Sequence, residues 1–285
     1  MQMHPLKKCF LFLFFVFGSI PIFGQNEVRF QAFGNSTKSI PDSLYSALRA
    51  AKTDSKKSQL LYLIGREHQK YGDGDSIIHY AKELSHFKET NDVPTLLKTK
   101  LLLGEGKLLK GLTNDAQKAF LEGLTVSKGQ QANSIQKWLE LGLAKTYMAK
   151  KEFAKSKELL DRLKLDLNDT IASKSWYLLA AIALREKAYV KTKMYLDEAS
   201  LRIAALEISR PKMEIQLLLA LLYHAKGEEE KALNTYNYLI NNALSENYFD
   251  IYTESVLGYG TIYRDRKAYE ASEMTLSMAY ANALN

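Results

Sequence analysis

Residues 219–236 read LALLYHAKGEEEKALNTY, a run in which two small residues, Ala220 and Ala232, stand twelve positions apart. Small residues at this spacing allow two antiparallel helices to cross closely, because a bulky side chain at either position would push the axes apart. Tyr223 and Tyr236 would fill the space above and below the crossing, and Gly227 is placed to end the first helix. This stretch therefore predicts a helical hairpin.

The same pattern occurs six times, at intervals of about forty residues. The opening small residues are Gly65, Gly104, Ala144, Ala180, Ala220 and Gly260, and the closing ones are Ser76, Ala116, Ser156, Thr192, Ala232 and Ser272. The closing residues are 40 apart, except for 36 between Ser156 and Thr192. In the first unit the offset from Gly65 to Ser76 is eleven, which predicts a unit one residue short. An internal repeat of this length indicates a stacked array. The expected fold is all-α, with about six hairpins over residues 57–285.

Residues such as Trp176, Leu179 and Ala180, followed by Tyr189 and Thr192, resemble the tetratricopeptide repeat (TPR). The resemblance covers nearly the whole array and implies a right-handed α-α superhelix, a TPR-like solenoid. The period of about 40 exceeds the usual 34, which is similar to the long-helix repeats of bacterial sensor and regulator proteins. HEAT and armadillo arrays share the forty-residue period and are the structural alternative, but they lack this spacing of small and aromatic residues.

The first 24 residues resemble a secretory signal peptide. Lys7 and Lys8 precede an apolar run from Cys9 to Phe23, and Gly24 stands before a polar stretch. Such a run is too short for a membrane-spanning helix, which needs about 20 apolar residues. We expect residues 1–24 to be a signal peptide and residues 25–56 to be a leader with an N-terminal capping helix at about 43–53. Cys9 is the only cysteine, so no disulfide is expected in the mature chain.

No catalytic or metal-binding pattern emerges from the sequence. His68, His79 and His86 could share a helix face, but zinc needs three or four converging ligands. Glu228 to Glu230 are adjacent to lysines and fit a solvated turn. The net charge of +7 comes from interspersed acids and bases, which gives little support to nucleic-acid binding. We expect no enzyme activity, no metal and no cofactor.

The candidate site is the concave groove of the array. In the TPR frame the first helix of each hairpin lines this groove, and the projected residues include a run of basic or donor groups. In this family similar rows bind extended peptides through carboxylate and backbone contacts. The predicted peptide-binding residues are Lys145, Tyr177, Arg185, His224 and Arg264.

The sequence thus predicts an exported, non-catalytic solenoid that binds a protein or peptide in the periplasm or cell envelope of a bacterium. Its leader resembles the input region of envelope-spanning sensor kinases and regulators. A structural scaffold subunit of an envelope complex is the alternative. The last helix, 269–285, has no polar capping helix after it. We expect that end to be covered by a partner or to self-associate.

Overall fold

The computed structural model describes residues 21–23, 26–27, 40–87, 93–128, 134–205, 209–246 and 248–284. Most of the predicted signal peptide and leader lies outside these residues. Within them, two short strands, β1 (Pro21–Phe23) and β2 (Asn26–Glu27), pair antiparallel. Every other regular element in the described ranges is an α-helix.

Six helical hairpins follow a single helix, α2 (Asp42–Ala50), as the sequence predicts. The hairpins are α3 (Asp54–Lys70) with α4 (Gly74–Ser85), α5 (Val93–Leu109) with α6 (Thr113–Ser127), α7 (Ser134–Ala149) with α8 (Phe153–Leu163), α9 (Asp169–Arg185) with α10 (Tyr189–Arg202), α11 (Arg210–Ala225) with α12 (Glu229–Ser245), and α13 (Phe249–Asp265) with α14 (Tyr269–Leu284). The spacing of 36 coincides with α8, which has only 11 residues against 15 in α6. A deletion of four residues removes about one helical turn and leaves the hairpin frame intact.

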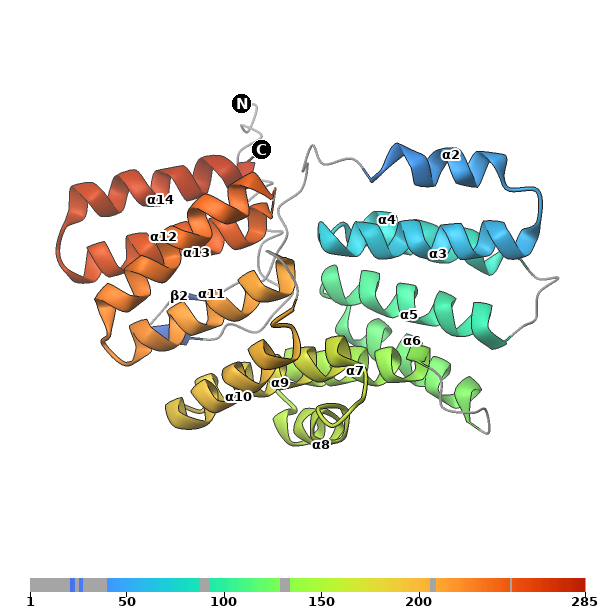
Figure 1. Cartoon of the computed structure of the whole chain (residues 1–285), viewed down its shortest axis with the longest axis horizontal. Coiled ribbons are helices and arrows are strands. Elements are labelled where there is room, and N and C mark those ends of the chain that lie inside the picture. Colours follow the sequence, from blue (N-terminus) through green and yellow to red (C-terminus); the bar gives the residue numbers. More distant parts are fainter. Residues whose placement is uncertain are drawn as a thin grey trace, which may run out of the picture.

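The hairpins stack into an α-solenoid with two layers. The first helix of each hairpin contacts the first helix of the next, from α3 through α13. Each second helix from α4 to α12 packs between two first helices, and α14 packs against α13. We call the odd-numbered helices α3 to α13 the inner helices and the even-numbered helices α4 to α14 the outer helices. The array bends so that α3 and α11 lie on opposite arms, with α7 and α9 at the bend (Figure 1).

The small residues lie at the hairpin crossings. Ala144, Ala180 and Ala220 have no exposed surface. In the third hairpin Ser156 Oγ donates to the carbonyl of Ala144 at 2.9 Å, and in the sixth Ser272 Oγ donates to that of Gly260 at the same distance. A serine at the closing position therefore adds a hydrogen bond between the two helices where the backbones approach most closely.

The first hairpin requires a correction. Ser76 is not the residue at the closing position, because Ile77, which is fully buried, occupies it. The amide of Ile77 donates to the carbonyl of Asp73, and that of Ala116 donates to Leu112 at the same point of the second hairpin. The offset from Gly65 is thus twelve in all six units, and the first unit is not a residue short.

All six hairpin turns share one backbone conformation. A single residue with positive φ precedes each outer helix: Gly72, Gly111, Lys151, Lys187, Gly227 and Lys267, with φ between 58° and 75°. The left-handed region suits glycine and is costly for a residue with a Cβ. Three of the six turns therefore carry backbone strain at a lysine.

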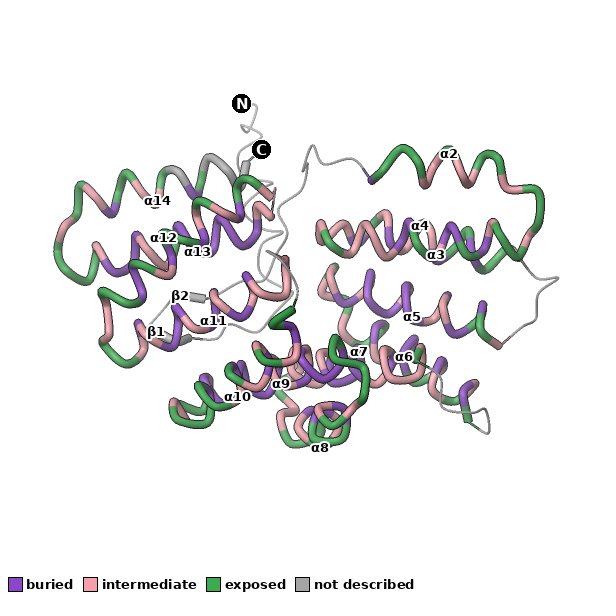
Figure 2. The backbone as a smooth tube through the Cα atoms, viewed as in Figure 1, coloured by how far each residue is buried: buried purple, intermediate pink, exposed green. Residues whose placement is uncertain are grey.

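The two ends of the array differ. At the N-terminal end α2 packs against α3, and Leu48 contacts a buried cluster that includes Leu61 and Ile77. At the other end the described part of α14 leaves Tyr269 and Tyr280 more than 60% exposed. Figure 2 shows buried residues along α5, α11 and α13, with mostly exposed or half-buried ones along α2 and α14. Among the described residues, no helix combines the length and the apolar character needed to cross a bilayer.

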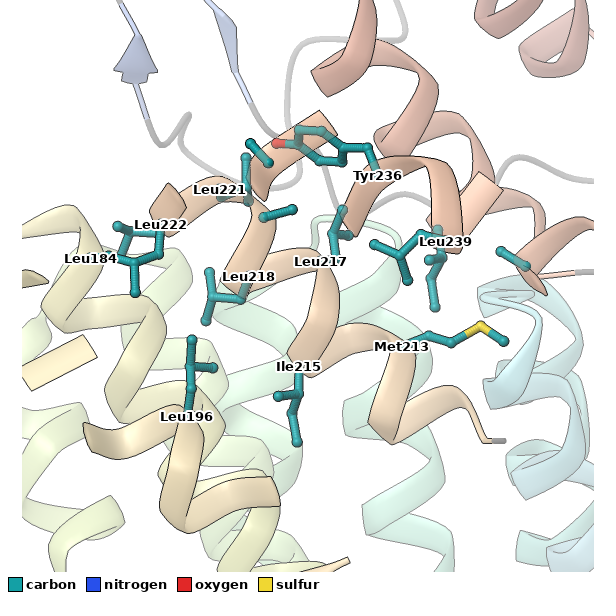
Figure 3. Packing of buried hydrophobic residues seen from close by; sticks show 14 of the residues in the cluster. Leu184, Leu196, Met213, Ile215, Leu217, Leu218, Leu221, Leu222, Tyr236 and Leu239 are labelled. Carbon is teal, nitrogen blue, oxygen red and sulfur yellow. The ribbon is translucent and has the colours of Figure 1, made fainter. Parts of the chain in front are cut away.

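The largest buried cluster joins the fourth, fifth and sixth hairpins. Leu217 and Leu218 of α11 contribute to it, together with Tyr236 and Leu239 of α12 (Figure 3). Tyr236 is fully buried, and a Cβ on Gly258 of α13 would lie 2.4 Å from its ring. The absence of a side chain at Gly258 therefore makes room for the ring. Residue volumes at successive contacts fix how the hairpins stack, and this in turn positions the inner helices.

Candidate binding surface on the inner face

Charged and aromatic side chains of different inner helices come together on the face that the bend encloses. Repeat spacing aligns them: positions one repeat apart in sequence lie on adjacent helices. We call this set the inner-face network, and it consists of Tyr62, Arg66, Lys98, Glu105, Trp138, Lys145, Lys174, Tyr177, Arg210, Glu214, Asp250 and Glu254.

Lys145 and Glu105 connect the second and third hairpins. The Nζ of Lys145 lies 3.5 Å from both carboxylate oxygens of Glu105. Glu105 is only 3% exposed, whereas Lys145 keeps partial access to solvent. A buried carboxylate is tolerated when a cation accompanies it. The pair therefore leaves the lysine as the group that a ligand would meet.

Arg210 is the most highly connected residue of the network. Its Nε donates to Glu214 Oε1 at 2.9 Å, and its two terminal nitrogens form a bidentate pair with Asp250 on α13. Burial disfavours the charge of Arg210, but Asp250 and Glu214 outweigh it and raise the arginine pKa. The guanidinium also stacks on Tyr248, 5.5 Å from the ring centroid. Such bidentate pairs are among the strongest polar contacts in proteins.

The same arginine closes the bend. Arg210 Nη1 donates to the carbonyl of Lys70 at 2.9 Å, across 140 positions of sequence. Lys70 is the last residue of α3, where helix carbonyls lack partners within the helix. The first and fifth hairpins are thus joined directly, and the inner face has a fixed width at this point.

Tyr177 and Glu214 lie at the centre of the network. Burial raises the pKa of Tyr177, and the nearby carboxylate of Glu214 raises it further. For Glu214, burial acts to raise the carboxyl pKa, but Lys174 and Arg210 overcome it, so the net shift is downward. Glu214 is therefore charged and Tyr177 is a neutral hydroxyl at physiological pH.

Arg66 and Trp138 bridge the first and third hairpins. The Cζ of Arg66 lies 4.7 Å from the indole centroid of Trp138, and Lys98 lies over the ring of Tyr62 at 5.6 Å. These distances are within the range of cation–π attraction. Aromatic surface and positive charge are thus combined at the start of the array.

The structure divides the predicted groove residues into two groups. Lys145 and Tyr177 belong to the inner-face network. Arg185, His224 and Arg264 lie near the hairpin turns, where they contact neighbouring groups. Arg185 stacks on Phe153 at 5.1 Å, while His224 Nε2 and Arg264 Nη2 lie 3.6 Å and 3.0 Å from Asp265. His224 is only 8% exposed, and burial lowers its pKa despite Asp265. Arg185, His224 and Arg264 therefore contact groups of the array itself, and their role in peptide binding stays a prediction.

Sequence reasoning missed most of the network, although the sequence contains a signal for it. Glu105 and Lys145, Lys174 and Glu214, and Arg210 and Asp250 are three pairs of opposite charge, each separated by 40 residues. In a forty-residue repeat this separation places the two charges at matching positions of adjacent inner helices. Searching for charge reversal at the repeat period would have found these pairs.

Other surfaces offer less specific chemistry. A depression of about 790 Å³ lies over α5 and α6, lined by residues that include Leu96, Lys100, Leu121 and Glu122. Within the described residues, no three side chains of His, Cys, Asp or Glu are grouped as metal ligands.

Comparison with known proteins identifies the fold. No protein-family model matches the chain, and no curated protein matches its sequence. Solved structures that are similar in fold include the following two. The apo form of RapI is 14% identical with a TM-score of 0.61, covering 85% of this chain and 70% of RapI. BtubC (BKLC) from P. vanneervenii is 16% identical with a TM-score of 0.53, covering 76% of this chain and 90% of BtubC. The chain is therefore a helical repeat protein.

Proposed function

We propose, from the helical repeat fold shared with those structures, that this protein binds a protein or peptide on its inner face and that its repeats are of the TPR type. The observation that carries the proposal is the inner-face network, in which all six hairpins contribute charged or aromatic groups. Its geometry is held by neighbouring hairpins. Little conformational entropy would be lost when a partner binds.

An extended polypeptide suits this surface. The inner helices present both acidic and basic groups, and Tyr62, Trp138 and Tyr177 supply aromatic surface among them. A bound chain could place its own charges and backbone amides against these side chains. It would then replace the ion pairs that the side chains form with one another. The role is non-catalytic, because the network is composed of ion pairs and cation–aromatic contacts that position side chains.

Binding can be tested with a charge swap that preserves the fold. The double variant Glu105→Lys with Lys145→Glu retains an ion pair but reverses its orientation. We expect a partner captured by the wild-type chain to bind at least tenfold more weakly to the swap in calorimetry, with a similar melting temperature. Lys191→Glu, on the exposed side of α10, is the matched control and should bind as the wild type does. Equal affinity of all three proteins would rule out the inner face.

We also propose that the protein is exported to the periplasm or cell envelope of a bacterium, in a role like that of a sensor input region. Lys7, Lys8 and the apolar run from Cys9 to Phe23 support export. N-terminal sequencing of protein recovered from the envelope fraction should begin at about Gln25. Recovery of an intact N-terminus from the cytosol would contradict this part of the proposal.

A scaffold subunit is the second candidate. The depression over α5 and α6 and the exposed tyrosines of α14 are surfaces outside the inner face that could hold partners permanently. A scaffold should co-purify with a stoichiometric partner whose cross-links map to outer helices. Cross-links confined to inner helices would favour the peptide-binding role. Self-association through α14 would appear as a concentration-dependent mass in light scattering.

A further inference from the structure

Arg66 and Lys174, like Lys98 beside Tyr62, differ from the other cations of the inner-face network because no carboxylate of a described residue lies at ion-pair distance. Lys145 has Glu105, and Arg210 has Glu214 and Asp250. Arg66 and Lys174 form no ion pair with a described residue. In addition, Nη1 of Arg66 is buried and has no hydrogen-bond partner in the described chain. Buried donors in folded proteins nearly always have a partner, so each exception needs an explanation.

The two cations lie within electrostatic range of each other. Lys174 on α9 interacts with the charges of Arg66 on α3 and Lys145 on α7, and both interactions lower its lysine pKa, in addition to the larger effect of burial. Glu214 and Glu105 act in the opposite direction without reaching ion-pair distance of Lys174. The first, third and fourth hairpins thus bring positive charge to one region, where Glu105 and Glu214 oppose it without forming an ion pair with Arg66 or Lys174.

The surroundings of Arg66 suit an anionic ligand that presents oxygen atoms. Trp138 covers one face of the Arg66 guanidinium, which fixes the plane in which its nitrogens can donate. A planar guanidinium held in this way matches the oxygen spacing of a carboxylate or phosphate, and the ammonium of Lys174 supplies a second point charge. The contact from Arg210 to Lys70 holds the arms of the bend together, so the cations cannot separate to reduce their repulsion.

We propose that Arg66 and Lys174 form an oxyanion-binding site on the inner face and that its ligand carries a carboxylate or phosphate group. The inference rests on the proposed function of this face and adds the chemistry that it recognises. The anion would accept hydrogen bonds from the unpartnered Arg66 Nη1 and from the Lys174 ammonium. Trp138 would be the adjoining wall.

Three probes test the site and distinguish its sources: inorganic phosphate, succinate, and a short acidic peptide prepared with either a free or an amidated C-terminus. Titrations are performed at constant ionic strength by calorimetry, with melting temperature as the second readout, since a ligand of the native state raises it. Arg66→Met and Lys174→Met remove each charge and keep an apolar stem. Lys191→Met, on the exposed face of α10, is the matched control.

We expect at least one probe to bind wild-type protein, with affinity reduced tenfold or more in Arg66→Met and in Lys174→Met and unchanged in Lys191→Met. Binding of free phosphate or succinate assigns a small anion, and binding of only the peptides assigns a polypeptide carboxylate. Arg66→Lys should recover part of the affinity. If Lys174→Met fails to fold, Arg66→Met still decides the outcome.

The site would be overturned if no probe bound, or if the control lost affinity as much as the two variants. It would also be overturned, with the proposed function intact, if a captured protein partner bound Arg66→Met and wild type equally well while no anion bound either protein. A partner that bound Arg66→Met normally but not the Glu105→Lys, Lys145→Glu double variant would also contradict the anion site and support the proposed function.

Discussion

Two successive contacts between hairpins fill the same repeat positions with different side chains. They are the contact between the second and third hairpins and the contact between the third and fourth. At the first, the ring of Phe120 lies between Gly104 and Gly142, and a Cβ on either glycine would lie 2.4 Å from it. At the second, Leu160 and Leu178 occupy the positions of Phe120 and Gly142 in the repeat, and both are buried in one cluster. Both arrangements fill the same space: one uses a ring and no side chain, the other uses two leucines.

Two further contacts follow the same rule. Between the fourth and fifth hairpins the pair is Leu196 with Leu218, both buried, and between the fifth and sixth it is Tyr236 with Gly258. A large residue at one position therefore accompanies a glycine at the other. Stacking in this array depends on the combined volume of two positions on different helices, and a change at one should be tolerated only with a compensating change at the other.

The largest effect is expected from Gly142→Leu. The new side chain would clash with Phe120 and should lower the free energy of unfolding by about 3 kcal/mol or more, beyond ordinary overpacking. Adding Phe120→Leu converts this contact to the leucine arrangement and should recover most of the loss. Urea unfolding of the two single variants and the double variant gives the coupling. Additive effects, with no coupling of about 1–3 kcal/mol, would refute the volume rule.

The two aromatic contacts also differ from each other. Phe120 has no polar atom, whereas the hydroxyl of Tyr236 is buried and has no hydrogen-bond partner in the described chain. Burial raises the pKa of Tyr236, so this hydroxyl is neutral. Tyr236→Phe should increase the free energy of unfolding by about 1–2 kcal/mol, because it removes an unsatisfied polar group without a cavity. Tyr236→Leu, which leaves space beside Gly258, should instead destabilise. A loss of stability in Tyr236→Phe would indicate a hydrogen bond to that hydroxyl.

The hairpin turns also differ at one position, and the expected effects on stability are smaller. The residue with positive φ is a glycine in three turns and a lysine in the other three. Lys187→Gly should stabilise by about 1 kcal/mol, because it relieves a left-handed residue with a Cβ. Gly227→Ala should destabilise by a similar amount. A Cβ at Gly227 would have no atom within 4 Å, so only the backbone is affected. Thermal unfolding of both variants should show a gain of stability in Lys187→Gly and a loss in Gly227→Ala. Changes in the same direction would contradict backbone strain at Lys187.

The smallest effect concerns pH and compares the first hairpin with the fifth. Burial lowers the pKa of His68 and of His224, although Asp73 and Asp265 act against it. The unfolded chain then binds protons more readily than the folded one. Stability is complete above the unfolded pKa of about 6.5 and decreases as pH falls below it. His224→Gln should flatten this decrease in unfolding measured from pH 7.5 to 5.5. Exposed His79→Gln is the control, and an unchanged slope in His224→Gln would contradict the assignment.

Local patterns in the sequence are sufficient for the hairpins and their crossings. The offset of twelve between Ala144 and Ser156 depends only on helix pitch and a short turn, so it recurs wherever a hairpin forms. The error at Ser76 had a specific cause: a small residue stood beside the large one, Ile77, that is actually buried. Small size alone does not identify the closing residue, because position relative to the turn decides which residue is enclosed.

The sequence by itself determined the all-helical repeat array, because helix periodicity and the hairpin offset are short-range properties of the chain. Only the tertiary structure decided which groups meet on the inner face when they are not one repeat apart in sequence. Arg66 reaches Trp138, and Arg210 reaches the carbonyl of Lys70, through the bend that accumulates over several hairpins. That bend depends on side-chain volumes at each successive contact, such as Phe120 against Gly142. A small rotation at each contact, summed over the array, brings together residues whose proximity no local pattern encodes.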